Sequence, residues 1–120
     1  MDKIIIRDLA LRTFIGVDES EQEKKQDVVL NLVLSVDLRA AGQSDRLEDT
    51  VNYRTLKHAI VAAVEGGRFH LLEYLAEQVA ALTLLDVRIR KVEVTVDKPG
   101  VLRYARSVAV VIERTQQKSE

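Results

Sequence analysis

An alternation of side chains at residues 27–38 constrains the fold of this chain more than any other feature of its sequence. Successive side chains of a β-strand point to opposite faces, so a two-residue period predicts a strand with one face on a core. One face of this segment is wholly apolar and consists of Val28, Leu30, Leu32, Leu34, Val36 and Leu38. The other face is mixed, because Val29 and Val33 alternate with polar residues. The segment is therefore predicted to be a long strand.

Three other segments show strand patterns, at 3–15, 88–98 and 107–113. A charged loop at 17–25 connects the first of them to the strand at 27–38. A turn at Pro99-Gly100 connects the other two. Two β-hairpins are therefore predicted, one in each half of the chain.

Two amphipathic helices are predicted between the hairpins. After a polar loop at 39–52, Asn52 is the expected N-cap of a helix that begins at Tyr53 and ends at Gly66-Gly67. The second helix is predicted at 71–85, with a buried stripe of Leu72, Leu75, Ala76, Val79 and Leu82. The resulting β-β-α-α-β-β order predicts an α+β fold, in which one antiparallel sheet carries both helices on one face.

The second face of the predicted sheet also carries small apolar residues, namely Val29, Val33, Ala109 and Val111. A single chain has no further element to cover them, so we expect the protein to oligomerise through the sheet. Residues 1–120 are expected to form one domain. The polar tail at 115–120 is expected to be flexible.

Composition argues against several classes of function. The chain has 18 basic and 19 acidic residues, a net charge of −1, so neither nucleic-acid binding by bulk charge nor a polybasic membrane anchor is expected. It has no cysteine, which excludes disulfides, thiolate metal ligands and thiol nucleophiles, and His58 and His70 are too few for an all-histidine metal site. No apolar run approaches the roughly 20 residues of a membrane helix, and no signal-peptide core follows the N-terminus. A cytoplasmic protein without a bound metal is therefore expected.

Four polar residues at the ends of predicted elements are candidates for chemistry. Lys98 follows a strand of valines on their apolar phase, where a partly desolvated amine suits proton exchange; alternatively, it extends to solvent from the strand end. Tyr53 either donates a phenolic proton or packs at a helix end. Glu73 either complements a helix dipole or accepts two adjacent N–H groups of a ligand. Glu21 lies in a charged loop, where a solvated charge is the ordinary explanation.

Five segments together resemble one enzyme family. They are LRTFIGVDESE at 11–21, QDVVLNLVLSVDL at 26–38, DTVNYRTL at 49–56, GRFHLLEYLAE at 67–77 and VDKPGVLRYARSVAV at 96–110. In order and spacing they resemble the dihydroneopterin aldolase family, which includes the dihydroneopterin triphosphate 2′-epimerases. The resemblance covers residues 3–114.

The resemblance implies the tunnelling fold (T-fold), in which four subunits form a ring with a continuous barrel. Two such rings stack into a homo-octamer, with active sites at the subunit interfaces. The implied substrate is a 7,8-dihydropterin with a trihydroxypropyl side chain, and no metal or organic cofactor is expected. Because the N5=C6 imine of the dihydropterin acts as the electron sink, retro-aldol cleavage needs no Schiff-base lysine.

The family's functional residues carry over to this chain one by one. Lys98 corresponds to a general acid/base near N5 of the pterin, and Tyr53, contributed by the adjacent subunit, shuttles protons with it. Glu21 corresponds to a residue near the side-chain hydroxyl groups. The implied pterin-binding groups are the carboxylate of Glu73 and the backbone of Leu72 and Val51.

The resemblance leaves two activities open. LRTFIG, VNYRT and LRYARSV are more similar to the epimerase, whereas the KPG turn at 98–100 is more similar to the aldolase, and the epimerase is favoured. The same segments contain Arg12, Arg54, Arg103 and Arg106, which are either ordinary surface arginines or partners of a triphosphate, with Arg103 as the candidate contact. An alternative of another class is a non-catalytic pterin-binding oligomer on the same fold.

Overall fold

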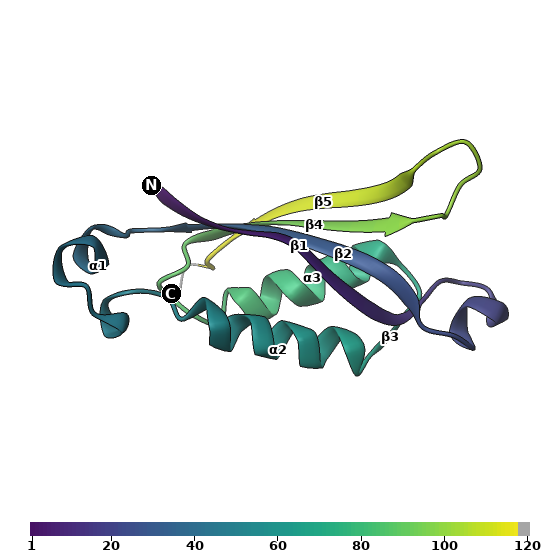
Figure 1. Ribbon diagram of the computed structural model, residues 1–120, viewed down its shortest axis with the longest axis horizontal. Coiled ribbons are helices and arrows are strands. Elements are labelled where there is room, and N and C mark those ends of the chain that lie inside the picture. The colour runs from purple at the N-terminus through teal and green to yellow at the C-terminus, as the bar shows by residue number, and fades with distance from the viewer. Residues whose placement is uncertain (118–120) are drawn as a thin grey trace.

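The computed structural model describes residues 1–117 of the chain. Its main sheet contains four long strands: β1 (Asp2–Ile15), β2 (Gln26–Val36), β4 (Lys91–Pro99) and β5 (Ser107–Thr115). These strands pair antiparallel in the order β1-β2-β4-β5. The helices α2 (Tyr53–Glu65) and α3 (Leu72–Thr83) both lie on one face of the sheet (Figure 1). The predicted α+β class, the element order and the single helical face are confirmed.

Four short elements escaped the sequence analysis. The helix α1 (Arg39–Ser44) and the 3₁₀ turn η2 (Leu47–Asp49) lie in the segment predicted as a loop, and the 3₁₀ turn η1 (Glu19–Gln22) lies in the charged loop. The two-residue strand β3 (Arg68–Phe69) pairs parallel with the end of β1. None of these elements is long enough for an apolar period to develop, and such periods are the basis of the prediction.

A β-bulge explains why the alternation in β1 is only partial. The pairing of β1 with β2 shifts by one residue between Ile6 and Leu9. Asp8 lies in this bulge with a left-handed φ of 53°, and its N–H donates to Asn31 Oδ1 at 2.9 Å. The additional residue changes the phase of the strand. Ile6 and Leu9, three positions apart, therefore both pack against the core.

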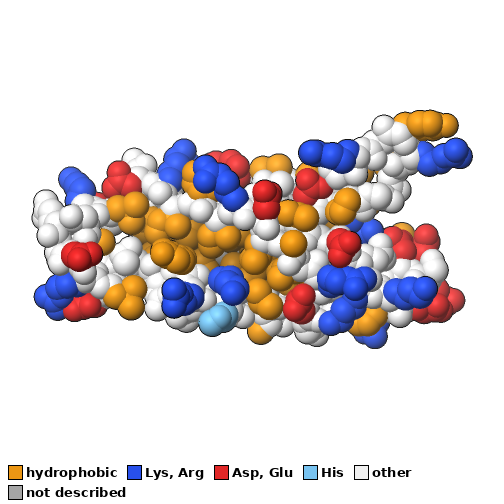
Figure 2. All heavy atoms as spheres, viewed as in Figure 1, with side chains coloured by type: hydrophobic (Ala, Val, Ile, Leu, Met, Phe, Trp, Pro, Cys, Tyr) orange, Lys and Arg blue, Asp and Glu red, His pale blue; other side chains and the backbone are white. Residues whose placement is uncertain are grey.

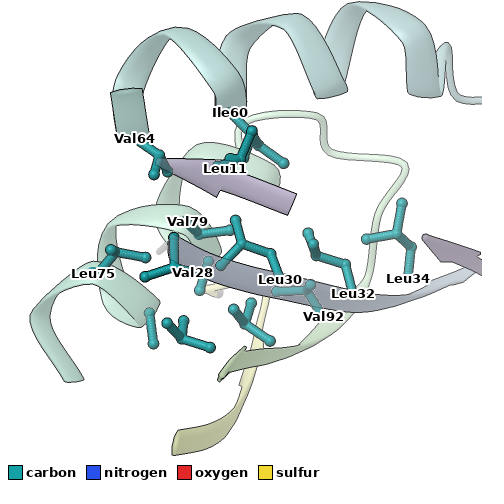
Figure 3. Packing of buried hydrophobic residues seen from close by; sticks show 14 of the residues in the cluster. Leu11, Val28, Leu30, Leu32, Leu34, Ile60, Val64, Leu75, Val79 and Val92 are labelled. Carbon is teal, nitrogen blue, oxygen red and sulfur yellow. The ribbon is translucent and has the colours of Figure 1, made fainter. Parts of the chain in front are cut away.

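The core lies between the sheet and the two helices, and β2 crosses its centre. The predicted apolar face of β2 is confirmed, because Val28, Leu30, Leu32, Leu34 and Val36 are all buried. In Figure 3 the side chains of Val28 and Leu30 lie among Val79 and Leu75 of α3, while Ile60 and Val64 extend from α2 toward Leu11. α2 packs over β1 and α3 packs over β4 and β5, so the buried face of β2 lies in the middle of the core.

The predicted boundaries of α2 follow from local chemistry. Asn52 Oδ1 accepts the N–H groups of Arg54 and Thr55 at 3.1 and 3.3 Å, so the expected N-cap is confirmed. The helix ends at Glu65, before the two glycines. α3 is shorter at both ends than the predicted 71–85.

The flexible tail was predicted at 115–120, and its first residue lies in a strand of the structure. Thr115 is the last residue of β5, and the Nε2 group of Gln116 lies 2.8 to 3.1 Å from the carbonyl oxygens of Leu84, Asp86 and Ile89. A polar side chain that binds backbone carbonyls orders this segment, although its composition resembles that of a loop. Residues 118–120 lie outside the described part of the chain.

The face of the sheet away from the helices carries the small apolar residues that the sequence places there. Val29 and Val33 are half-buried, whereas Ala109 and Val111 are exposed. Oligomerisation through the sheet stays a prediction. No helix within residues 1–117 is long and apolar enough to span a membrane.

Candidate active site

Lys98 is almost fully buried at the end of β4. It shares the phase of Val92, Val94 and Val96, as the sequence pattern predicts, and its exposed fraction is 7%. Burial of an amine is unfavourable unless polar groups replace its hydration. Two groups do so here: Lys98 Nζ donates to Gln26 Oε1 at 2.5 Å and lies 3.9 Å from Glu21 Oε2. The alternative of a lysine that simply reaches solvent is therefore wrong.

Gln26 is a member of this cluster that the sequence analysis missed. Its Nε2 group donates to the carbonyl oxygens of Ile15 at 2.9 Å and Glu21 at 3.3 Å, which leaves its Oε1 for Lys98. A signal was present in the sequence, because Gln26 continues the apolar phase of β2 two residues before Val28. A polar residue in the phase of a buried face needs a polar partner.

Glu21 is held in place by the backbone around it. Gly16 has a φ of 142°, and a Cβ atom there would lie within 2.5 Å of Glu21 Cβ and Oε1. The Asp18 N–H donates to Glu21 Oε1 at 3.3 Å. Gln22 ties the same turn to its neighbours, since its Nε2 donates to Gly16 O at 2.7 Å and to Phe69 O at 3.0 Å. The charged loop is therefore an anchored turn that presents a carboxylate to Lys98.

Glu73 and Leu72 begin α3 at the same end of the molecule as Lys98. In Figure 1, α3 starts beside β3, at the end of the sheet where β4 finishes. Glu73 is exposed in the first helical turn, where its charge is favourable to the helix dipole. An exposed carboxylate at this position is free to accept N–H groups from a ligand.

Tyr53 and Val51 lie at the opposite end. Thr13, which pairs with Gln26 across the sheet, bonds to Val64 O near the C-terminal end of α2. Tyr53 begins that helix, and a helix rises about 17 Å over eleven residues. Tyr53 is 58% exposed in the single chain. In Figure 1, α2 runs along the sheet, with its first residues toward α1 and its last residues toward β3.

The four candidate arginines are likewise divided between the Lys98 end and the Tyr53 end of the molecule. Arg103 and Arg106 are exposed on the connection between β4 and β5, which protrudes from the body with basic and hydrophobic side chains (Figure 2). Arg12 contacts Lys25 O at 3.0 Å and Asp27 at 3.4 Å on the surface. Arg54 follows Tyr53 in α2. Of these four arginines, one chain therefore presents Arg103, Arg106 and Arg12 at the end that contains Lys98.

Within residues 1–117, no three His, Asp or Glu side chains lie close enough together to hold a metal ion. His58 and His70 are both exposed. The chemistry available at the Lys98 end is that of an amine, a carboxylate and an amide, which suits proton transfer.

Comparison with known proteins identifies the family. The sequence profile described as dihydroneopterin aldolase matches residues 4–113. The chain belongs to the dihydroneopterin aldolase family. It is 41% identical to the dihydroneopterin triphosphate 2′-epimerase of Pseudomonas aeruginosa over 112 residues, which are 93% of this chain and 91% of that protein. It is 38% identical to the dihydroneopterin aldolase of Escherichia coli over 114 residues, 95% of this chain and 93% of the relative.

Solved structures give the same result for the fold. Escherichia coli dihydroneopterin aldolase in complex with neopterin superposes with a TM-score of 0.91 at 38% identity, covering 95% of this chain and 99% of the other. A uricase from Bacillus fastidious superposes with a TM-score of 0.71 at 10% identity over 98% of this chain and 48% of its own. The fold is thus the tunnelling fold, and the chain is a pterin-metabolising enzyme of the dihydroneopterin aldolase family.

Proposed function

We propose that this enzyme is a dihydroneopterin triphosphate 2′-epimerase, which converts 7,8-dihydroneopterin triphosphate into 7,8-dihydromonapterin triphosphate. The observation that carries the chemistry is the buried Lys98 amine, 3.9 Å from the Glu21 carboxylate. The two groups provide a proton donor and acceptor on a substrate whose imine is the electron sink. Two epimerases at 41% and 38% identity and an aldolase at 38% are similarly close to this chain, so the choice of the epimerase rests on the segments LRTFIG, VNYRT and LRYARSV.

The proposed reaction proceeds by cleavage and re-addition. The Glu21 carboxylate accepts the 2′-hydroxyl proton as the C1′–C2′ bond breaks, and the electron pair of that bond moves through C6 to N5, which takes a proton from Lys98. The products are an enamine and an aldehyde. Re-addition of the enamine to the other face of the aldehyde returns the proton from N5 and inverts C2′. Protonation of C1′ instead, followed by release of the aldehyde, is the aldolase outcome.

The proposed binding site combines groups from two copies of the chain. Glu73 and the backbone of Leu72 would hold the pterin at the Lys98 end, and the backbone of Val51 and the Tyr53 hydroxyl would come from the adjacent subunit. Tyr53 begins α2, at the end of this helix that lies away from Lys98. One chain therefore does not bring Tyr53 to its own Lys98, and this separation favours a site shared by two chains. The proposed assembly is a homo-octamer of two stacked rings.

Arg103 is the proposed contact for the triphosphate. It is exposed on the protruding β4–β5 connection, with its guanidinium 5.4 Å from the centre of the Tyr104 ring. A planar, permanently charged guanidinium pairs well with phosphate oxygens. Arg103→Ala is expected to raise the KM for the triphosphate substrate and to leave the KM for unphosphorylated dihydroneopterin unchanged.

The deciding experiment offers the enzyme both substrates. Anaerobic incubation with 7,8-dihydroneopterin triphosphate, and separately with dihydroneopterin, is followed by oxidation and chromatography that resolves neopterin, monapterin and hydroxymethylpterin. Mainly monapterin triphosphate from the first substrate supports the epimerase. Mainly hydroxymethylpterin and glycolaldehyde from the second would make the enzyme an aldolase, the second candidate, which the KPG turn at 98–100 favours.

Substitution of Lys98 separates catalysis from binding. Lys98→Ala is expected to lower turnover by at least about a hundredfold, because an acid/base group is lost, while pterin affinity stays within a few-fold. Product formation by quenched-flow analysis and pterin binding by fluorescence measure the two effects. Unchanged product formation would exclude Lys98 as the acid/base, and a wild type that binds pterin without turnover would indicate a pure binding protein.

A further inference from the structure

The buried amine of Lys98 has a neutral group as its nearest partner. Gln26 Oε1 accepts from Lys98 Nζ at 2.5 Å, whereas the nearest carboxylate oxygen, on Glu21, lies 3.9 Å away. We propose that Gln26 is a positioning residue, which holds Lys98 Nζ in both of its protonation states. This inference rests on the proposed function, in which Lys98 gives and takes a proton in each cycle.

The amide of Gln26 has one orientation that fits its surroundings. Its Nε2 donates to Ile15 O and Glu21 O, both of which are acceptors only. The oxygen of the amide must then face Lys98. A glutamate of the same shape has no N–H to offer these two carbonyls, so the site specifies glutamine rather than any polar residue of that length.

A neutral acceptor suits an amine that changes its charge. An ammonium has three N–H groups and a neutral amine has two, so each of them can donate to an amide oxygen. A carboxylate in the same place would favour the ammonium strongly, because opposite charges attract more in a poorly hydrated site. The turn around Gly16 keeps the Glu21 carboxylate farther from Lys98 than the amide. The nearest partner of Lys98 thus holds the amine in position through a neutral group.

Two substitutions at Gln26 test this role. Gln26→Met keeps the length and removes the acceptor, and Gln26→Glu keeps the shape and adds a charge. For both variants we expect kcat to fall by about ten- to a hundredfold, since positioning of an acid/base group is lost, with the KM for the pterin within threefold. For Gln26→Glu the pH profile of kcat is also expected to move to higher pH.

Gln22→Met is the matched control. Gln22 lies in the same turn and its Nε2 also donates to two backbone carbonyls, those of Gly16 and Phe69, without contact to Lys98. We expect it to lower the melting temperature as much as Gln26→Met does and to leave the pH profile in place. Equal loss of kcat in Gln22→Met and Gln26→Met, with an unmoved pH profile in Gln26→Glu, would overturn the proposal, because loosening of the turn would then explain the effect.

A titration independent of activity separates this proposal from the proposed function. The chemical shift of Lys98 Cε, followed by NMR with labelled lysine, reports protonation of the amine directly. We expect its titration to move to higher pH in Gln26→Glu and to stay in place in Gln22→Met. An unmoved titration in Gln26→Glu overturns the role of Gln26 even if the enzyme is an epimerase. A moved titration in a protein that converts neither substrate supports that role and contradicts the proposed function.

Discussion

Gly16 stands where the chain leaves β1, in a conformation and a space that no other residue fits. Its φ of 142° is unfavourable for any residue with a side chain, and the Glu21 side chain occupies the position of a Cβ atom. Gly16→Ala is therefore expected to lower the free energy of unfolding by about 1–3 kcal/mol and to displace Glu21 from Lys98. Urea denaturation and turnover measure the two effects.

Gly42→Ala is the control for this prediction. Gly42 lies in α1 and a Cβ atom there meets no atom within 4 Å. Alanine is the better helix former by about 1 kcal/mol, so this change is expected to be neutral or stabilising and to leave turnover unchanged. Equal stability of the two variants would contradict the close packing of Gly16 against Glu21.

Thr13 joins the sheet to a helix through a single buried hydroxyl group. Its Oγ1 donates to Val64 O at 2.6 Å, at the C-terminal end of α2. Thr13→Val keeps the volume but removes this donor, and is expected to cost about 1–2 kcal/mol of unfolding free energy. Thr83→Val is the comparison, because the Thr83 hydroxyl donates only within its own helix, to Val79 O. We expect the cost at Thr83 to be the smaller of the two in urea denaturation, and the reverse order would exclude a special role for the Thr13 contact.

At the scale of elements, the periodicity of apolar residues could predict only those strands and helices that bury one face in the core. The apolar alternation of β2 and the stripes of α2 and α3 are properties of neighbouring residues, so a sequence displays them. The bulge at Asp8 depends on a contact with Asn31 from another strand, and β3 depends on the end of β1. Such elements follow from tertiary contacts, which no local pattern contains.

The connection between α3 and β4 is held by an ion pair that also reaches the segment before α2. Asp86 accepts from Arg88 Nε at 3.2 Å and from Nη2 at 3.0 Å, and Arg88 Nη1 donates to Thr50 O, next to Val51. The hydrogen bond from the Arg88 side chain is the largest reason that the pKa of Asp86 lies below its ordinary value of 3.8. Because this pKa is lowered, ionised Asp86 stabilises the folded protein fully above about pH 4. The stabilisation is lost as the pH falls through the pKa that Asp86 has in the folded protein.

Arg88→Gln is therefore expected to raise the pKa of Asp86 toward 3.8 and to lower stability at pH 7 more than at pH 3. Carboxyl NMR titration and urea midpoints at the two pH values measure this. Arg90→Gln is the control, because the Arg90 side chain donates to Val87 O and not to Asp86. The same loss of stability at both pH values would show that Arg88 acts through packing rather than through the ion pair.

At the scale of the whole molecule, the candidate site residues form two groups at opposite ends of the sheet. The structure brings Lys98 and Glu21 together, although 77 positions of sequence separate them, and it adds Gln26. It leaves Tyr53 and Val51 at the other end. Sequence patterns could nominate Lys98, Tyr53, Glu73 and Glu21, whereas Val51 was named only through the family resemblance. Only the resemblance to a family could assign them to one site, since a single chain keeps the two groups apart.

The edges of the sheet are suited to such a second chain. β5 is an edge strand that pairs only with β4 among the described strands, and the free edge of β1 pairs with β3 only at Phe14 and Ile15. Long unpaired edges present backbone N–H and C=O groups that another copy can pair with. Edge pairing of this kind would continue the sheet from one subunit to the next and bring the Tyr53 end of one chain toward the Lys98 end of its neighbour.

A shared site predicts that two inactive variants restore each other. Lys98→Ala and Tyr53→Phe are each expected to be nearly inactive as pure oligomers. In mixed oligomers from co-expression, a site regains activity when one subunit supplies Lys98 and its neighbour supplies Tyr53, which random assembly in equal amounts produces at about a quarter of the sites. Recovery of about a quarter of wild-type turnover, measured on purified mixed oligomers against mixtures that have not exchanged subunits, is the expected result. If co-expression restores no activity while native mass spectrometry shows mixed oligomers, both residues act within one chain.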